Sequence, residues 1–381
     1  MKKYDFDTII DRSQTSSLKW EKYKETDIIP LWVADMDFRS SDPVREALIQ
    51  RSSHGIYGYT LPPEELYEVI ISRLQERYGW NIEKEWMIWL PGLVSGINIS
   101  CRAVGSRGDE VMTVTPAYPP FFTAPGNMNR TLVTSPMISE QDRWIMDIDH
   151  LRSKVTPRTK LFLFCSPHNP TGRVFSEKEL SDVVEFCLEN DIIICSDEIH
   201  CDLILDKTKD HIPTAAFSPE AADRSITLMA PSKTYNIAGL GCSFAVIPNS
   251  SLRESFREAM KGIVPHVNLM GYTAALAAYK YGHTWLTEVL DYLKKNHDYV
   301  YSSIKSMDLL QMYPVQGTYL AWINAAEIKK KNPAAFFEQY GLGFSDGYDF
   351  GEKNFIRLNF GCPRSLLEKA MDRLHYSLRN L

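Results

Sequence analysis

Residues 228–240 read L-M-A-P-S-K-T-Y-N-I-A-G-L. The apolar run Ile226–Ala230 ends at Pro231, and Ser232 and Lys233 follow at once, before polar residues and a glycine. This pattern is typical of a buried strand that enters a tight turn, which would hold one lysine at the strand end. Lysine is a poor nucleophile at its ordinary pKa, but desolvation lowers that pKa and lets the amine form a Schiff base with a carbonyl. The alternative is a surface lysine in a loop, and the other stretches of the chain decide between the two.

Apolar runs and helical patterns alternate through the middle of the chain. In one helical segment, Ser176-x-x-Glu179 makes a capping box ahead of apolar residues at helical spacing. Continuous Ile, Leu, Val and Phe runs separated by helices indicate a mostly parallel sheet that is buried on both faces. The strands expected from these runs are 110–115, 161–166, 192–196 and 226–230.

Four side chains suited to ligand binding follow these strands. Ligands of open parallel sheets bind outside the carboxyl ends of the strands. The residues that fall there are Tyr118, Asn169, Asp197 and Lys233. Taken singly, Asp197 could be a helix N-cap, Asn169 a turn residue and Tyr118 part of the core. Their order at successive strand ends favours one shared site.

A strand–glycine–helix junction lies further upstream. The apolar run 86–92 ends in Pro91-Gly92, and residues 93–104 read as a helix. Such a junction presents free backbone N–H groups and the positive end of the helix dipole to an anion. The region of Val94 and Ser95, together with Ser232, is therefore a candidate phosphate site.

The composition is that of a globular protein and limits its partners. The 381 residues are 44% hydrophobic and 24% charged, enough for two domains and a large core. The formal charge of −6 argues against a nucleic-acid or anionic-membrane surface, and no run approaches the roughly 18 apolar residues of a membrane span. Residues 1–11 carry three aspartates and no long apolar stretch, unlike a signal peptide. The seven cysteines are scattered without a C-x-x-C pair, which favours reduced thiols in a cytoplasmic protein.

The patterns predict three regions along the chain. Residues 1–45 read as an extended arm, in which Pro30–Phe38 mixes large apolar residues with two aspartates and should pack against another part of the protein. A large domain should span 46–283, and a small domain, joined by the arm, should span 284–381. The elements expected in the small domain are a long helix from Trp285, strands 315–323 and 354–359, and a last helix capped by Ser365-x-x-Glu368.

The four strand-end residues suit a cofactor with an aldehyde, a ring nitrogen, a phenolic oxygen and a phosphate. Lys233 would hold the aldehyde, and Asp197 could pair with a protonated ring nitrogen and keep the ring an electron sink. Asn169 could donate a hydrogen bond to the phenolic oxygen, and Tyr118 offers an aromatic face for stacking.

Several stretches together carry a resemblance to a known family. Over nearly its whole length the chain resembles the pyridoxal-phosphate enzymes of fold type I, the aspartate-aminotransferase-like superfamily. Within that superfamily it looks like the cystathionine β-lyase group of the MalY and PatB type. The stretches are S-L-K-W (17–20), L-W-V-A-D-M-D-F (31–38), P-H-N-P-T-G-R-V (167–174), S-D-E-I-H-C-D-L (196–203), S-K-T-Y-N-I-A-G-L (232–240) and I-R-L-N-F-G-C-P-R-S (356–365).

The resemblance implies a fold and a homodimer with shared active sites. The fold would be α/β, with a large domain built on a mostly parallel seven-stranded sheet flanked by helices and a smaller α+β domain. The cofactor would be pyridoxal 5′-phosphate. Tyr59 matches the tyrosine that crosses the dimer interface to the neighbour's cofactor and takes part in catalysis, with Tyr57 as the rival candidate.

The resemblance also assigns the remaining roles. Lys233 matches the Schiff-base lysine, and Arg357 matches the arginine that grips the substrate α-carboxylate, a two-point task suited to guanidinium. Trp32 and Ala34 would contribute to substrate binding. The residues matched to cofactor binding are Asp197, Asn169, Tyr118, His200, Ser232, Val94 and Ser95.

Three positions depart from the aminotransferases. They have a tyrosine three residues after the aspartate, a serine three before the lysine and an arginine eight after it, where this chain has His200, Ala230 and Gly241. The phosphate contacts are therefore less well defined by the resemblance than the rest. A zinc site at His200, Cys201 and Cys195 is disfavoured, because no second histidine or cysteine pair has metal-ligand spacing.

The expected activity is a C–S β-lyase acting on cystathionine, cysteine or related thioethers. An aminotransferase of the same fold is the first alternative, since it would use the same Lys233, Asp197, Asn169 and Arg357. A regulatory protein that binds a transcription factor is a second, which the resemblance permits. A dinucleotide-dependent dehydrogenase is disfavoured, because no G-x-G-x-x-G follows a strand.

Overall fold

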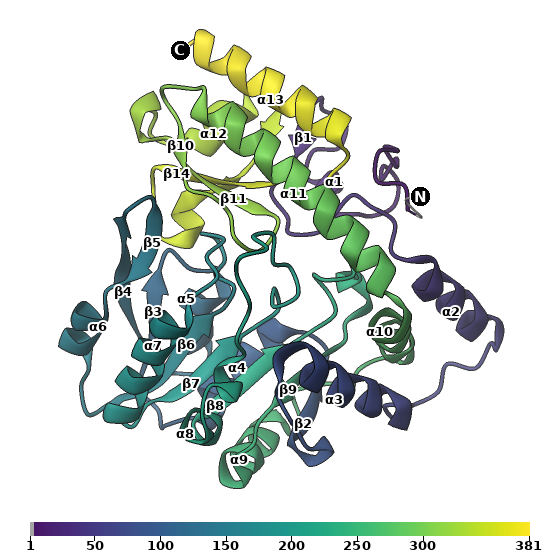
Figure 1. Cartoon of the computed structure of the whole chain (residues 1–381), viewed down its shortest axis with the longest axis vertical. Coiled ribbons are helices and arrows are strands. Elements are labelled where there is room, and N and C mark those ends of the chain that lie inside the picture. Colours follow the sequence, from purple (N-terminus) through teal and green to yellow (C-terminus); the bar gives the residue numbers. More distant parts are fainter. Residues whose placement is uncertain (1–3) are drawn as a thin grey trace.

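The computed structural model describes residues 4–381, and its largest element is an eight-stranded sheet between two layers of helices (Figure 1). Only β9 and β5 run antiparallel to the other strands. The strands, in their order across the sheet, are β2 (Met87–Leu90), β9 (Ser243–Val246), β8 (Ser225–Met229), β7 (Ile193–Asp197), β6 (Thr159–Cys165), β3 (Glu110–Thr115), β4 (Thr131–Glu140) and β5 (Arg143–Met146).

Alternate residues of each strand enter different cores, as the two-residue period of a strand requires. In β6, Leu161 and Leu163 pack with α4, α5 and α9, whereas Phe162 and Phe164 pack with α6, α7 and α8. Near β2 and β9, helices α3 and α10 cover the same face of the sheet as Phe162 and Phe164. These helices are α3 (Glu64–Tyr78), α4 (Leu93–Ala103), α5 (Pro120–Asn127), α6 (Ile148–Lys154), α7 (Glu177–Glu189), α8 (Pro219–Asp223), α9 (Ser250–Met260) and α10 (Leu269–Tyr281).

The sheet confirms the predicted α/β class but corrects the expected strand count of seven. The eighth strand, β5, pairs antiparallel with β4 at the sheet edge. The residues of β4 and β5 are mostly exposed or half-buried, so they form no continuous apolar run in the sequence. Strand β9 was also not predicted, because it is only four residues long and begins with a serine.

A second, smaller sheet contains four antiparallel strands and is packed against long helices. Its strands, in order, are β10 (Gln311–Met312), β11 (Leu320–Asn324), β14 (Phe355–Asn359) and β13 (Ser345–Asp346). The helices are α11 (His283–Lys305), α12 (Pro333–Glu338) and α13 (Arg364–Arg379). Helix α13 begins at Arg364 after Pro363 with no side-chain cap, so the predicted Ser365 capping box is wrong, whereas the Ser176–Glu179 box is present.

The N-terminal arm packs against the part of the chain that carries the smaller sheet. It contains α1 (Leu18–Glu21) and β1 (Ile29–Pro30), and β1 pairs parallel with β12 (Leu342–Gly343). Leu31 and Met36 are buried in a core that also holds Ala274 of α10 and Leu358 of β14. Because this core is shared by all three regions, the domain boundaries at 45 and 283 stay predictions. Helix α2 (Asp42–Ser53) then leads away from the arm.

Candidate active site

Lys233 lies in the turn that follows β8, as the sequence predicts. The Tyr235 N–H donates to the Pro231 carbonyl at 2.9 Å and the Ile237 N–H to the Ser232 carbonyl at 3.0 Å, which closes the turn. The Lys233 Nζ donates to the Ala34 carbonyl of the arm at 2.6 Å. Lys233 therefore lines a cavity of about 660 Å³ between the large sheet, the small sheet and the arm.

Burial makes Lys233 an unusually weak base for a lysine. Burial is the largest cause of an ammonium pKa lowered to about 8; the carboxylates of Asp35 and Asp197 oppose the shift, and the charge of Arg357 adds to it. Roughly a tenth of the amine is therefore unprotonated at pH 7, far more than for an ordinary lysine, and a nucleophile or general base requires this form.

Asp197 is the last residue of β7, the strand beside β8, and it lines the same cavity. Burial raises the pKa of this carboxyl to about 7; the N–H of Ile199 and the charge of Lys233 lower it, and Glu198 raises it. Within residues 4–381, the Asp197 carboxyl group accepts one hydrogen bond, from the Ile199 N–H at 3.1 Å. A buried carboxylate with so few partners favours a cationic partner in the cavity.

Asn169 and Arg357 meet across the cavity. Asn169 follows β6, and its Oδ1 accepts a hydrogen bond from Arg357 Nη1 at 3.0 Å. Because the amide oxygen is engaged by the guanidinium, the Asn169 Nδ2 is the group left to donate to a ligand. The large and small sheets are thus joined through the two side chains at the cavity itself.

Arg357 is a buried arginine on β14, held at its far end by the arm. Its Nη2 donates to the Trp32 carbonyl at 2.8 Å and to Ser345 Oγ at 3.3 Å, and the guanidinium lies 4.5 Å from the centre of the Phe350 ring. Burial lowers its pKa to about 10. Its Nε is buried without a hydrogen-bond partner among residues 4–381, so the guanidinium retains capacity for an anionic ligand.

Tyr118 and His200 complete the walls of the cavity. Burial raises the pKa of the Tyr118 phenol, and burial lowers the pKa of His200 to about 3, so its imidazole is neutral. His200 Nδ1 is buried without a hydrogen-bond partner in the described part of the chain, and its ring centre lies 6.2 Å from that of Tyr319. A neutral imidazole with an unused nitrogen can contact a ring or oxygen of a ligand.

Only some of the residues predicted for the phosphate end of the site line the cavity. Gly92, Leu93 and Val94 at the start of α4 line the cavity, as does Ser232, whereas Ser95 is half-buried and does not line it. The free N–H groups of a helix start and a serine hydroxyl fit a phosphate.

Gly241, where the aminotransferases have an arginine, lies in a backbone conformation that disfavours a side chain. Its φ of +56° is a left-handed conformation, and a Cβ at this position would lie 3.1 Å from the Pro91 carbonyl oxygen. An arginine would therefore be strained in this backbone. Ala230 is buried, and like Gly241 it offers no side-chain group to a phosphate.

Trp32 and Ala34 line the cavity, as predicted. The cavity is also lined by three residues that were not predicted as site residues, Val33, Ser345 and Phe350. Val33 is part of the stretch quoted for the resemblance, so its neighbours could have indicated it. Ser345 and Phe350 lie in the separate segment around β13, and no pattern in the sequence indicated that this segment folds over the site.

Tyr57 and Tyr59 do not reach the cavity of their own chain. They lie between α2 and α3 and are 59% and 107% exposed, and the Tyr57 hydroxyl donates to the Ser52 carbonyl at 2.9 Å. Ile56 and Leu61 of the same loop are also exposed. The structure of one chain therefore brings together every predicted site residue except Ser95 and these two tyrosines.

The residues present fit pyridoxal phosphate. An amine of lowered pKa suits the aldehyde, a sparsely bonded buried carboxyl suits the ring nitrogen, and an amide donor suits the phenolic oxygen. The unpartnered nitrogens of His200 and Arg357 are unused capacity in the same cavity. No group of three or more His, Cys, Asp or Glu side chains suited to a metal ion occurs within residues 4–381.

The chain belongs to the class I and II aminotransferase family, whose model matches residues 26–374. It is 33% identical to the cystathionine β-lyase PatB of Bacillus subtilis (strain 168), over 98% of this chain and 100% of that protein. The crystal structure of OvoB has a TM-score of 0.97 and 47% identity, with 98% of this chain and 99% of that chain covered. The pyridoxal-phosphate-bound C–S lyase of Staphylococcus hominis has a TM-score of 0.93 and 34% identity, with 98% of each chain covered.

These similarities confirm the predicted fold type and family. The fold is that of the fold type I pyridoxal-phosphate enzymes, and the solved C–S lyases share it over almost their whole length. No helix within residues 4–381 is long and apolar enough to cross a membrane.

Proposed function

We propose that this protein is a pyridoxal-phosphate-dependent C–S β-lyase. It converts cystathionine or related cysteine thioethers and water to a thiol, pyruvate and ammonia. The observation that carries the proposal is the convergence of Lys233, Asp197 and Arg357 on one cavity. Relatives named cystathionine β-lyase and C–S lyase, similar over the full length, support the reaction type.

When bound, the cofactor supplies an electron sink that stabilises negative charge at the substrate Cα. Lys233 would hold its aldehyde, Asp197 its ring nitrogen and Asn169 its phenolic oxygen, while Ser232 and the start of α4 would hold its phosphate. His200 and Tyr118 would contact its ring. Each of these residues lines the cavity.

Arg357 would bind the substrate α-carboxylate and thereby fix the orientation of Cα. With substrate bound, the Lys233 Nζ would be free to take the Cα proton as a general base, a role that its lowered pKa allows. The Cβ–S bond then breaks and the sulfur leaves as a thiolate. Lys233 or a tyrosine donates the proton that this sulfur needs, and the remaining three-carbon fragment is hydrolysed to pyruvate and ammonia.

The test is to incubate the purified holoenzyme with cystathionine and no keto acid. We expect pyruvate and free thiol to form steadily in equal amounts over many turnovers. An aminotransferase, the second candidate that the family itself favours, would stop after one turnover until a keto acid is added. Cycling of amino groups between keto acids, without pyruvate from any cysteine thioether, would assign the protein to that second class.

We also propose a homodimer with shared active sites. The support is the exposed apolar loop between α2 and α3, because Ile56, Tyr57, Tyr59 and Leu61 are costly to leave in water. In the dimer, Tyr59 or Tyr57 would enter the partner's cavity. A cytoplasmic location is supported by the seven cysteines, all of which are free thiols.

Mixed dimers test the shared site. Tyr59→Phe and Lys233→Ala subunits, each inactive as a homodimer, should regain part of the activity when mixed, because one site of each hybrid is intact. If the hybrids, shown to have formed by mass measurement, remain inactive, Tyr59 does not act in the partner's site. The same pairing with Tyr57→Phe distinguishes the two tyrosines.

A further inference from the structure

The arm loop, residues 32–38, forms the wall of the cavity that faces Lys233. Trp32, Val33 and Ala34 line the cavity. The Ala34 carbonyl accepts hydrogen bonds from Lys233 Nζ at 2.6 Å and from the Tyr319 hydroxyl at 2.8 Å. The position of this carbonyl therefore decides where the lysine amine rests.

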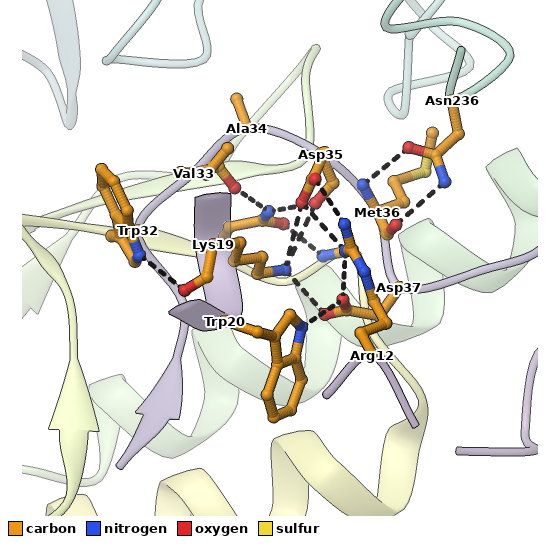
Figure 2. Close-up of polar contacts among 12 residues, drawn as sticks. Arg12, Lys19, Trp20, Trp32, Val33, Ala34, Asp35, Met36, Asp37 and Asn236 are labelled. Atoms are coloured by element: carbon orange, nitrogen blue, oxygen red, sulfur yellow. Dashed lines mark hydrogen bonds and ion pairs between the residues drawn. The ribbon is translucent and has the colours of Figure 1, made fainter. Parts of the chain in front are cut away.

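Two cations, Arg12 and Lys19, contact the carboxylates of Asp35 and Asp37 in the arm loop (Figure 2). Lys19 Nζ contacts Asp37 Oδ2 at 2.6 Å, the Asp35 carbonyl at 3.3 Å and Asp35 Oδ1 at 3.7 Å. Arg12 reaches the same two carboxylates, with Nη1 2.7 Å from Asp37 Oδ1 and Nη2 2.9 Å from Asp35 Oδ2. We call Arg12, Lys19, Asp35 and Asp37 the arm network.

Lys19 is the central member of the arm network. Its side chain is 0% exposed, and a lysine is almost never fully buried unless it is paired. Burial alone would raise the pKa of Asp37, but the charge and hydrogen bond of Lys19, with hydrogen bonds from Trp20 and Arg12, hold that pKa below its usual value. Two cations thus balance two carboxylates in an enclosed position. Buried ion pairs often add little stability over apolar packing, so their clearer effect is on geometry and local charge.

Neutral side chains support the rest of the arm loop. Asn236, in the same turn as Lys233, accepts from the Met36 N–H at 2.9 Å and donates to the carbonyls of Met36 and Phe38 at 2.9 and 2.8 Å (Figure 2). Asn359 donates to the carbonyls of Val33 and Asp35 at 2.5 and 2.6 Å. The arm loop is therefore supported both by the charged arm network and by neutral side chains.

We propose that Lys19, together with Arg12, is a positioning residue for Lys233: it holds the arm loop so that the Ala34 carbonyl meets the Lys233 amine, and it balances the Asp35 charge beside that amine. The inference rests on the proposed function, because it takes Lys233 to be the residue that carries the cofactor. Lys19 does not line the cavity, so contact with a bound ligand does not account for its complete burial beside the arm loop.

The charges that face Lys233 come from several elements. Asp35 of the arm loop and Asp197 of β7 are negative when ionised, Arg357 of β14 is positive, and His200 and Tyr319 are neutral neighbours. Burial lowers the Lys233 pKa most, and Asp35 is the strongest influence in the opposite direction. Removing a cation from the arm network leaves Asp35 less balanced, so the protonated form of the Lys233 nitrogen should become more stable. Removing the Asp35 charge should have the opposite effect.

The experiment is a spectrophotometric pH titration of the cofactor absorption band in each holoenzyme. Lys19→Met and Arg12→Gln should raise the midpoint pH of this titration, and Asp35→Asn should lower it. Each shift should be roughly half to one pH unit, the size expected from the loss of one nearby charge. Arg12→Lys keeps the charge and should titrate like wild type. Lys24→Met is the matched control, because Lys24 is exposed, close in sequence and outside the cavity lining.

Opposite shifts for Arg12→Gln and Asp35→Asn, with Arg12→Lys unshifted, would establish the positioning role. Arg12 is partly exposed, so these variants decide the question even if Lys19→Met does not fold. Unchanged midpoints in folded variants that merely melt at lower temperature would make the arm network structural only and overturn the proposal. A wild type without any cofactor band would instead overturn the cofactor assignment, so the two failures are distinguishable.

Discussion

The two walls of the cavity are built in different ways. Asn169, Asp197 and Lys233 follow β6, β7 and β8, three neighbouring strands, so the backbone ladder of the large sheet places them together. On the opposite wall, Trp32 and Ala34 belong to an arm loop that is not part of either sheet. Its backbone makes a hydrogen bond from the Asp37 N–H to the Gly361 carbonyl but is held mostly by side chains, including Asn359 and the arm network.

Because of this difference, substitutions in the two walls should have different effects on activity and on stability. A side chain at a strand end can be removed with little effect on the ladder that positions it. A side chain that supports the arm loop contributes both to folding and to the shape of the site. Substitutions in the first wall should therefore reduce activity alone, and those in the second should reduce activity and stability together.

The largest expected effect is that of Lys233→Ala. The variant should lose the cofactor absorption band and at least ~10⁴-fold in turnover, because the same nitrogen holds the cofactor and moves the Cα proton. Its melting temperature without cofactor should stay close to that of the cofactor-free wild type. A variant that still turns over cystathionine at a tenth of the wild-type rate would remove Lys233 from the mechanism.

Asp197→Asn should follow, with a fall of roughly 10²–10³-fold in turnover, because the neutral amide cannot keep the ring nitrogen protonated. The pH dependence of stability gives a second measurement. Burial raises the pKa of Asp197 from 3.8 to about 7, so the folded cofactor-free protein binds more protons than the unfolded chain in this window and loses stability as pH rises through it. Denaturant unfolding at pH 5 and pH 8 should show a loss of roughly 2–3 kcal/mol in wild type that Asp197→Asn lacks. Equal pH profiles for the two proteins would place the carboxyl in a solvated environment.

Arg357→Lys should reduce catalytic efficiency by roughly 10–100-fold, because an ammonium cannot make the two-point contact of guanidinium. The cofactor should remain bound, since the residues that would hold it lie on the other wall. The effect should appear mainly in KM if the arginine only binds the carboxylate, and in kcat as well if it aligns the Cβ–S bond. Unchanged kinetics with cystathionine would mean that another group binds the carboxylate.

Asn359→Ala should give the smallest effect on activity but a clear effect on stability. The variant loses two hydrogen bonds to the arm loop carbonyls, Val33 and Asp35, which should lower the free energy of unfolding by about 1–3 kcal/mol and efficiency by roughly tenfold. Asn190→Ala is a matched control, because Asn190 bonds one carbonyl of its own helix end and does not line the cavity. If Asn359→Ala loses activity without stability, the proposed division between the two walls is wrong.

The sequence alone determined the sheet wall of the site. Each strand of this wall is a short run of buried apolar residues, and a polar residue at its carboxyl end marks where the run stops, as at Asp197 and Lys233. Parallel strands bring their carboxyl ends to one edge, so neighbouring elements with the right pattern are enough to predict a shared site. The roles of Arg357, Trp32 and Ala34 came only from the family resemblance, because no periodic pattern links them to the sheet.

Tertiary structure decided the features that depend on contacts between distant segments. In the sequence, Lys19, Asp35 and Asp37 are ordinary charged residues of an arm. Only the folded chain shows that Lys19 is buried and paired with carboxylates of the arm loop, which forms the wall opposite Lys233. The close approach of the Pro91 carbonyl oxygen to Gly241 likewise appears only in the folded chain. Local sequence carries the period and the ends of secondary structure, whereas burial and charge balance are properties of groups that meet only on folding. The strand-end residues can therefore be predicted from the local sequence around them, but the side chains that hold the opposite wall in place cannot.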